Sequence, residues 1–202
     1  MTTKKHLGPV PLIYPIPIAL VGAQVDGKPN FTEVGDVGIM GIKPPYVYVS
    51  LGEKSYTRLG ISQTGEYSLN FPSTAMMAEA DYCGVASGSK INKADLFSIF
   101  YDPEGLPVLP LIEECPVNLA CKVVSHFTLE HRNIFVGSVV QTYVNESCFT
   151  EQDGKQILAD LTVLDPLIYA LDNRYYRIGS PIGTGYQEGK QIAPPTSDAP
   201  AD

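Results

Sequence analysis

The sequence predicts a mainly β protein, an antiparallel β-barrel with short peripheral helices. Three observations lead to this fold class. Short apolar runs alternate with turn residues, among them 17 Pro and 18 Gly in 202 residues. Both predicted helices are short and lie beside turns. The chain also lacks the strand–helix–strand alternation of a doubly wound parallel sheet.

Length and composition fit a single globular domain. The chain is long enough for one compact domain, and 44% hydrophobic against 18% charged residues is ordinary globular composition. From residue 187 onward the chain is polar and contains Pro194-Pro195 and Pro200. We expect a domain over residues 1–186 and a polar C-terminal tail over residues 187–202, either disordered or an arm on a neighbouring subunit.

Charge and hydropathy restrict the partners. A formal net charge of −8 argues against nucleic acid or an anionic membrane as a partner, although it leaves room for a local phosphate pocket. The polar segment Met1 to Gly8 is not followed by the apolar core of a signal peptide. No apolar run reaches the roughly 18 residues that a membrane span needs. We expect a cytoplasmic protein with no membrane partner.

The cysteines predict neither disulfides nor a metal site. They are widely spaced, form no C-x-x-C pair and are accompanied by only three histidines, so zinc-ligand spacing is absent. In a reducing compartment they are expected to be free and mostly buried. They are Cys83, Cys115, Cys121 and Cys148.

The first part of the chain predicts three strands joined by turns. Asp26-Gly27 follows the apolar strand Ile16–Val25 and is a strong hairpin signal. A second strand is predicted over Thr32–Ile42 and is broken by Pro44-Pro45. Alternating aromatic and β-branched residues predict a third strand over Tyr46–Leu51.

A short helix is predicted over Thr57–Thr64. Thr57 is its expected N-cap, Leu59 and Ile61 face inward, and Gly65 ends it. The other predicted elements are a strand Glu66–Phe71, a helix Thr74–Tyr82, a mixed, loop-rich stretch Ala86–Leu109, a long antiparallel pair Pro116–Leu129 and Asn133–Asn145 that turns at Glu130-His131-Arg132, a strand or irregular segment Leu158–Leu164, and a short strand Arg174–Ile178.

The sequence lacks the usual catalytic motifs. It has no Walker A sequence and no G-x-S-x-G elbow, and the nearest approach to G-x-G-x-x-G, at Gly183 to Glu188, lacks the third glycine. The carboxylates show no paired spacing that suggests acid–base work. Any chemistry is therefore expected to reside in a cofactor.

The segment Lys54-Ser55-Tyr56-Thr57-Arg58 is a candidate anion site. It follows a strand and opens a predicted helix, so hydroxyls, cations and free backbone N–H groups meet at a helix N-terminus. The alternative is that Thr57 only caps the helix and the cations are solvated.

Three further segments have both a functional and a plain structural interpretation. Ser87-Gly88-Ser89-Lys90-Ile91-Asn92-Lys93 can offer backbone donors and a cation to an anion, or it is an ordinary surface loop. Asn30-Phe31-Thr32 places polar groups at a strand start, as turns often do. His131 at the long hairpin turn is either simply exposed or a group that titrates near neutrality and binds a ligand.

Together these segments resemble the flavin-reductase-like family with the FMN-binding split-barrel fold. The resemblance runs from Tyr14 to Gly179, and Cys83-Gly84 before the Ser-Gly pair is most similar to the flavoredoxin branch. The matching segments, in order, are Pro15 to Val21 with Asp26 to Asn30, Pro44-Pro45 before Val47 to Ser50, Lys54 to Thr57, Gly65 to Asn70, Ser87-Gly88 with Lys93, and His131 to Val139, which is similar to the family's "H-x-x-F-V-G-x-V" strand.

The resemblance implies a set of residues around the flavin ring. The backbone of Asn30, Phe31 and Thr32, with Ser50 and Leu51, would border the isoalloxazine ring and the ribityl chain. Cys83 and Gly84 would approach the flavin from beyond the second helix. The candidate catalytic residue His131 would lie near the substrate side of the ring, contributed either by this chain or by the other subunit.

The resemblance also implies a phosphate site. Ser55, Thr57 and Lys54 would hold the phosphate, with Lys93 helping. Tyr56 and Ser87 lie in the same two segments and complete the expected cofactor-binding set.

The resemblance implies an FMN-binding oxidoreductase, either an NAD(P)H-dependent flavin reductase or a flavoredoxin-like electron carrier. The flavin would carry the redox chemistry, and NADH or NADPH would need only to stack on its exposed face. A homodimer with FMN at the interface is expected, with a nicotinamide or a redox protein as the other partner. The alternatives are a non-catalytic flavin store or sensor, or a split-barrel protein that acts on another ligand such as haem or a pyridoxal compound.

Overall fold

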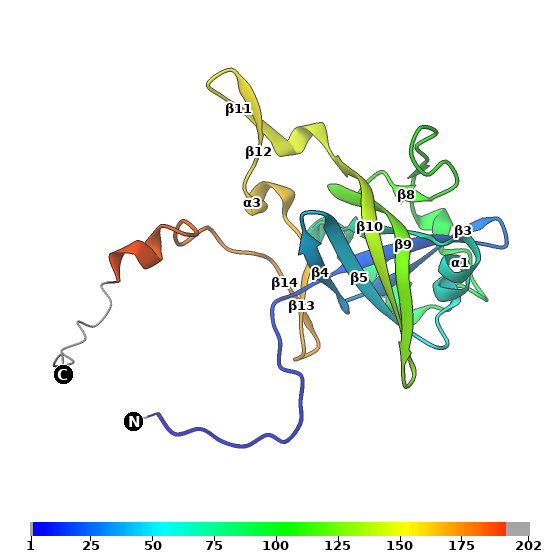
Figure 1. Cartoon of the computed structure of the whole chain (residues 1–202), viewed down its shortest axis with the longest axis horizontal. Helices are drawn as coiled ribbons and strands as arrows, with labels where there is room; N and C mark the ends of the chain where they lie inside the picture. The colour runs from blue at the N-terminus through cyan, green and yellow to red at the C-terminus, as the bar shows by residue number, and fades with distance from the viewer. Residues whose placement is uncertain (1, 193–202) are drawn as a thin grey trace, which may run out of the picture.

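The main body is one antiparallel sheet of seven strands (Figure 1). The computed structural model describes residues 2–192. The strand order is β3-β2-β6-β9-β10-β5-β4. The strands are β2 (Ala19–Val25), β3 (Lys28–Val34), β4 (Val37–Ile42), β5 (Pro45–Gly52), β6 (Glu66–Phe71), β9 (Val117–Leu129) and β10 (Arg132–Val144).

The link between β3 and β4 makes the sheet curl into an open barrel. β3 pairs with β2 and β4 pairs with β5, so the two strands lie at opposite edges of the sheet order. Only Gly35 and Asp36 separate them, and such a link spans at most about 10 Å. The two edges must therefore approach each other. The prediction of one strand over Thr32–Ile42 was wrong because its two halves pair with different partners.

Buried side chains fill the barrel. The Tyr67 hydroxyl on β6 donates to the backbone oxygen of Val47 on β5 at 3.1 Å, across strands that are not neighbours in the sheet. Gly137 makes room for this ring, since a Cβ there would lie 2.5 Å from the Tyr67 hydroxyl. The main cluster around them includes Val21, Val49, Leu69, Cys121 and Phe135.

A buried polar network ties the strands together beneath the loops. Asn70 Nδ2 donates to the backbone oxygen of Leu20 at 2.8 Å, and its Oδ1 accepts from the Ile112 N–H and from Asn118 Nδ2. Asn118 also donates to the Ile112 oxygen. A buried amide that is satisfied in this way fixes the relative position of its neighbours.

Helix α1 (Tyr56–Thr64) packs closely against β2. A Cβ on Gly60 would lie 2.3 Å from the Gln24 backbone oxygen, so glycine is needed for this approach. Ile61 is buried as predicted, but Leu59 is 38% exposed, so its predicted inward orientation was wrong. Gly65 ends the helix in the left-handed conformation, as predicted.

Several predicted boundaries differ from the structure. The long hairpin turns at Glu130-His131, and Arg132 is already the first residue of β10. The predicted helix Thr74–Tyr82 is a 3₁₀ turn followed by α2 (Met77–Val85). The segment Leu158–Leu164 contains a one-turn helix, α3 (Leu161–Leu164), capped by the Asp160 side chain.

The remaining elements are short. In the loop-rich stretch and after the long hairpin the sequence did not predict β7, β8, β11, β12 or β13. They are β1 (Ile16–Pro17), η1 (Thr74–Met76), η2 (Lys93–Leu96), β7 (Ile99–Phe100), β8 (Leu111–Ile112), η3 (Glu146–Cys148), β11 (Phe149–Gln152), β12 (Lys155–Leu158), β13 (Ile168–Ala170), β14 (Arg174–Tyr176) and η4 (Glu188–Gln191).

Figure 1 shows three segments that extend away from the body of the molecule: the N-terminal arm (residues 2–15), the β11–β12 hairpin and the segment that leads to η4. Residues 193–202, most of the predicted C-terminal tail, lie outside the described residues. Within residues 2–192 no helix is long and apolar enough to cross a membrane. The four cysteines are free and buried, as predicted.

Candidate functional site

A pocket of about 390 Å³ lies at the start of α1 and brings together most of the predicted site. We call it the α1 pocket. Its walls come from β3, the start of α1, the end of α2 and the loop that follows α2. The predicted residues that line it are Asn30, Thr32, Lys54, Ser55, Tyr56, Thr57, Gly84, Ser87 and Lys93, and Val85, Ala86 and Gly88 complete it.

Two neighbouring recesses extend the α1 pocket into a groove. One of about 200 Å³ shares Thr32 and Ser55 with it and contains the predicted residues Ser50 and Leu51. The other, of about 410 Å³, shares Asn30, Tyr56 and Gly88 and continues along the loop to Asn92. We call the first of these the Ser50 recess.

Ser55 gives the α1 pocket an unused hydrogen-bonding group. It is the N-cap residue of α1, but its side chain makes no capping hydrogen bond. Its Oγ is buried and has no hydrogen-bond partner among residues 2–192. The first backbone N–H groups of a helix also have no acceptor within the helix. With Lys54 beside them, these donors form a cradle suited to an anion.

Thr57 has a different role from the one predicted. It was expected to be the N-cap, but it lies inside the first turn and is fully buried. Its Oγ1 accepts a 2.6 Å hydrogen bond from Asn30 Nδ2. Because Asn30 is on β3, this bond joins the strand to the helix at the pocket. Gly88 lies against the other side of Asn30, where a Cβ would meet Asn30 Oδ1 at 2.0 Å.

Lys93 is a buried cation rather than a solvated one. Its side chain is 2% exposed, and Nζ donates to the backbone oxygens of Cys83 at 2.7 Å and Ala86 at 2.9 Å. Burial lowers the pKa of Lys93, while the Cys83 thiol acts in the opposite direction. An ammonium carries three N–H groups, so one remains for a ligand in the α1 pocket.

Phe31 and Cys83 lie behind the pocket rather than in its wall. Phe31 is fully buried and packs edge-on against Phe97, with ring centroids 5.7 Å apart. Burial raises the pKa of the Cys83 thiol to about 11, so the thiol stays protonated at neutral pH.

His131 is not brought to the pocket by this chain. It lies at the tip of the β9–β10 hairpin with its side chain 82% exposed, and Nδ1 is 3.5 Å from Glu53 Oε2. It lines neither the α1 pocket nor the Ser50 recess.

Arg132 is a site residue that sequence reasoning missed. Its guanidinium donates to Ser50 Oγ at 3.0 Å and to the Ser50 backbone oxygen at 2.7 Å, and it pairs with Asp36. It therefore places a positive charge in the wall of the Ser50 recess. It was assigned to the hairpin turn, although its pairing with Gly52 puts it on the strand.

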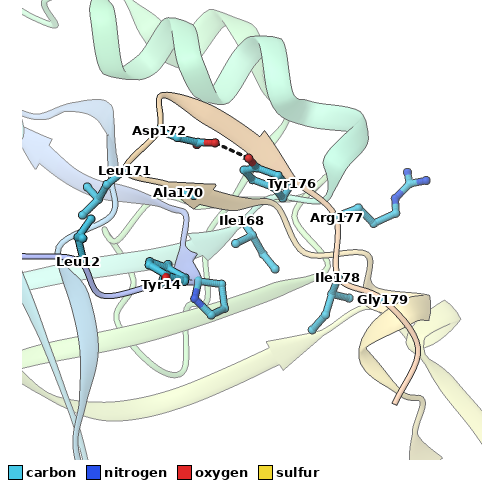
Figure 2. Close-up of a pocket in the computed structure, with 11 residues that line it drawn as sticks. Leu12, Tyr14, Ile168, Ala170, Leu171, Asp172, Tyr176, Arg177, Ile178 and Gly179 are labelled. Atoms are coloured by element: carbon cyan, nitrogen blue, oxygen red, sulfur yellow. Dashed lines mark hydrogen bonds between the residues drawn. The ribbon is translucent and has the colours of Figure 1, made fainter. Parts of the chain in front are cut away.

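A separate, apolar pocket of about 590 Å³ lies between the N-terminal arm and the β13–β14 hairpin (Figure 2). Sequence reasoning missed it because it did not predict β13 and assigned no structure to the arm. Arg177 at its edge is paired with Asp165. The lining residues also include Leu12, Tyr14, Pro15, Ile168, Ala170, Leu171 and Tyr176.

Comparison with known proteins identifies the family. The sequence model of the family described as "Flavin reductase like domain" matches residues 12–179. The chain belongs to the flavin reductase like family. The predicted family and mainly β split-barrel fold are thus confirmed.

Solved structures of the family share the fold of this flavin-reductase-like protein. Flavoredoxin from Methanosarcina acetivorans is 35% identical with a TM-score of 0.85, and the match covers 94% of this chain and 98% of that one. Flavoredoxin of Desulfovibrio vulgaris (Miyazaki F) is 31% identical with a TM-score of 0.82, covering 93% and 100%. An FMN-binding protein from Thermus thermophilus, 23% identical, covers 90% and 100% with a TM-score of 0.70 and shows the same fold.

Thr57→Val tests the bond between strand and helix. We expect it to lower the free energy of unfolding of the ligand-free protein by about 1–3 kcal/mol, because Asn30 Nδ2 would lose its buried acceptor. Urea unfolding measures the change. Thr57→Ser keeps the acceptor and is the control. Equal stability of the Val variant and the native protein would contradict the role given to this bond.

Proposed function

We propose that this flavin-reductase-like protein binds FMN non-covalently in the α1 pocket and acts as a redox protein of the flavoredoxin kind. The observation that carries the proposal is the buried Ser55 Oγ, which has no hydrogen-bond partner within residues 2–192 and lies in a pocket lined by Lys54 and Lys93. An unpaired buried hydroxyl is costly, and a ligand that pairs with it removes the cost.

The residues present fit an FMN phosphate. Ser55 Oγ, the first N–H groups of α1 and the Lys54 ammonium would hold it, and Lys93 would add its remaining N–H. Such charge-assisted hydrogen bonds favour a dianion over a neutral group. They also explain how a chain of net charge −8 could bind an anion, since Lys54 and Lys93 both line this pocket.

The Ser50 recess fits the polar part of a flavin ring. Ser50, Leu51 and Thr32 line it, and Arg132 supplies a positive charge that is fixed by Asp36. A flavin supplies hydride and electron chemistry when bound, and the protein supplies position and electrostatics. The residues of this chain would orient the ring, and the Arg132 charge would favour an electron-rich ligand beside it.

An electron carrier and a flavin reductase differ in the electron donor that reduces the flavin. The flavoredoxins match this chain at 35% and 31% identity over nearly its whole length, which favours an electron carrier with a protein partner. An NAD(P)H-dependent flavin reductase is the other form. A cytoplasmic location stays a prediction.

We further propose that the protein is a homodimer. Apolar surface that the single chain leaves uncovered supports this. The edge strand β4 exposes Ile39, Met40 and Ile42, which are 73%, 57% and 77% exposed. The N-terminal arm extends from the body beside the apolar pocket (Figures 1 and 2). An exposed apolar edge strand generally calls for a covering partner. Sedimentation equilibrium of the native protein tests this: a dimer is expected, and a monomer mass would overturn it.

Ser55→Ala tests the phosphate site. The purified native protein should be yellow, because a bound flavin absorbs blue light, or it should become yellow when FMN is added and bound. In the variant, the Kd for FMN should rise by a factor equivalent to about 1–3 kcal/mol, because one hydrogen bond to the phosphate is lost. Quenching of FMN fluorescence measures the Kd. Ser62→Ala, on an exposed position of the same helix, is the control.

The absorption spectrum also decides between classes of ligand. A haem or pyridoxal spectrum, or a colourless protein that ignores added FMN, would reject FMN as the ligand. An unchanged Kd in Ser55→Ala would move the phosphate away from α1.

Anaerobic mixing with NADH or NADPH tests the donor. For an electron carrier we expect slow bleaching of the bound flavin by either nucleotide and fast reduction by a reduced protein carrier such as a ferredoxin. The stopped-flow absorbance of the flavin measures both rates. Rapid bleaching by one nucleotide would instead establish a flavin reductase.

A further inference from the structure

A cluster of three oxygen-bearing side chains adjoins the cofactor site, and none of them has a role in the function proposed above. The Tyr175 hydroxyl oxygen, on β14, is 2.8 Å from Glu33 Oε1 on β3 and 2.9 Å from Asp81 Oδ1 on α2. Residues far apart in the sequence thus meet at one phenol.

The cluster has too few protons if both carboxyl groups are ionised. A phenol has one O–H, so it can donate fully to only one carboxylate. Both short distances are satisfied when one carboxyl is protonated and donates to the Tyr175 oxygen while Tyr175 donates to the other carboxylate. The arrangement therefore calls for one shared proton between Glu33 and Asp81.

Glu33 is the better place for that proton. Burial raises the pKa of Glu33 and the negative charge of Asp81 raises it further, against a hydrogen bond from Tyr175 that lowers it. Asp81 is exposed, so its carboxylate is better solvated.

The cluster runs from the cofactor site to the surface. Glu33 lines the Ser50 recess beside Thr32 and Ser55. Its Oε2 also lies against Gly84 of the α1 pocket, where a Cβ would come within 2.5 Å. At the other end Asp81 reaches solvent, so Tyr175 is the only link between an inner and an outer carboxyl in this three-residue cluster.

Other charged groups nearby are already engaged. Lys93 is held by two backbone oxygens, and Arg132 is held by Asp36 and Ser50. Within residues 2–192 neither cation pairs with Glu33. The titratable and charged groups around the cluster are Glu79, Asp81 and Cys83 on α2, Lys93 on η2, Tyr169 on β13, Tyr175 on β14, and Asp36 with Arg132 across the Ser50 recess.

We propose that Glu33, Tyr175 and Asp81 form a proton relay in which Glu33 holds one proton at the wall of the cofactor site and Asp81 replaces it from solvent. This rests on the proposed function, because reduction of a flavin by an electron or hydride donor also consumes protons.

The transfer is balanced at each residue. When Glu33 gives up its proton to the reduced ligand in the cofactor site, Asp81 takes one from solvent. Its O–H bond then breaks toward the Tyr175 oxygen as the Tyr175 O–H bond breaks toward Glu33 Oε1. Tyr175 and Asp81 return to their starting states and Glu33 is again protonated. The electrons come from the donor and go to the cofactor, and no residue of the relay is oxidised.

The first test needs no flavin. With ¹³C-labelled glutamate side chains, the Glu33 carboxyl signal, assigned by its loss in Glu33→Gln, should titrate at a higher pH than the exposed glutamates. Stability gives a second readout. A native group with a raised pKa contributes stability that is lost as pH rises through that pKa. The difference in the free energy of unfolding between the native protein and Glu33→Gln should therefore shrink from acid to neutral pH.

The second test uses the FMN-loaded protein. Proton uptake after rapid reduction, followed with a pH-indicator dye, should slow at least about tenfold in Tyr175→Phe. Tyr169→Phe is the matched control, because Tyr169 packs against Tyr175 while its hydroxyl donates to Asn173 Oδ1, at 3.4 Å, and to neither carboxyl group of the cluster within residues 2–192. If Tyr175→Phe fails to fold, Asp81→Asn tests the solvent end of the relay, because Asp81 is exposed and its substitution disturbs no buried contact.

The outcomes separate this inference from the proposed function. If the protein binds no FMN, the proposed function is rejected. The Glu33 titration then still decides whether Glu33 holds a proton at neutral pH. Normal FMN binding with an ordinary Glu33 titration, or with equal proton uptake in Tyr175→Phe and the native protein, overturns the relay and leaves the proposed function standing. A purely structural Tyr175 would change stability without changing the rate of proton uptake.

Discussion

The close packing of α1 against the β2–β3 hairpin is the constraint on which the site depends. Gly60 lets the helix lie against the Gln24 backbone, and the hydrogen bond from Asn30 to Thr57 fixes the first turn of the helix relative to β3. With the helix held at both places, its free N–H groups and Ser55 point to one wall of the α1 pocket. The same contacts that complete the core therefore build the anion cradle.

The curl of the sheet adds the opposite wall. Since Gly35 and Asp36 join strands at opposite edges, β3 and β5 come close together and the Ser50 recess forms between them. Asp36 in this link also pairs with Arg132, so the connection that closes the barrel positions a guanidinium beside the recess. Fold and charge placement are set by one two-residue link.

The charged side chains near the site of this acidic chain differ in how deeply they are buried. Lys93 is buried and satisfied by backbone oxygens, which leaves a cation near the pocket that solvent does not screen. Glu33 is partly buried and is linked to solvent through Tyr175 and Asp81. The net charge of the chain gives no hint of this arrangement, because it counts both kinds of group without their positions.

The sequence by itself determined the strand-rich class, the long hairpin, the helix over Thr57–Thr64 and the segments that supply the pocket, because turn residues and hydrophobic alternation are local signals. Only the tertiary structure decided that Thr57 bonds Asn30 instead of capping, that Lys93 is buried and that Arg132 and Tyr175 lie by the site. These features depend on strand pairing and on contacts between residues far apart in the chain. A local pattern cannot specify them, because the same residue type serves as a cap, a core group or a ligand according to what packs against it.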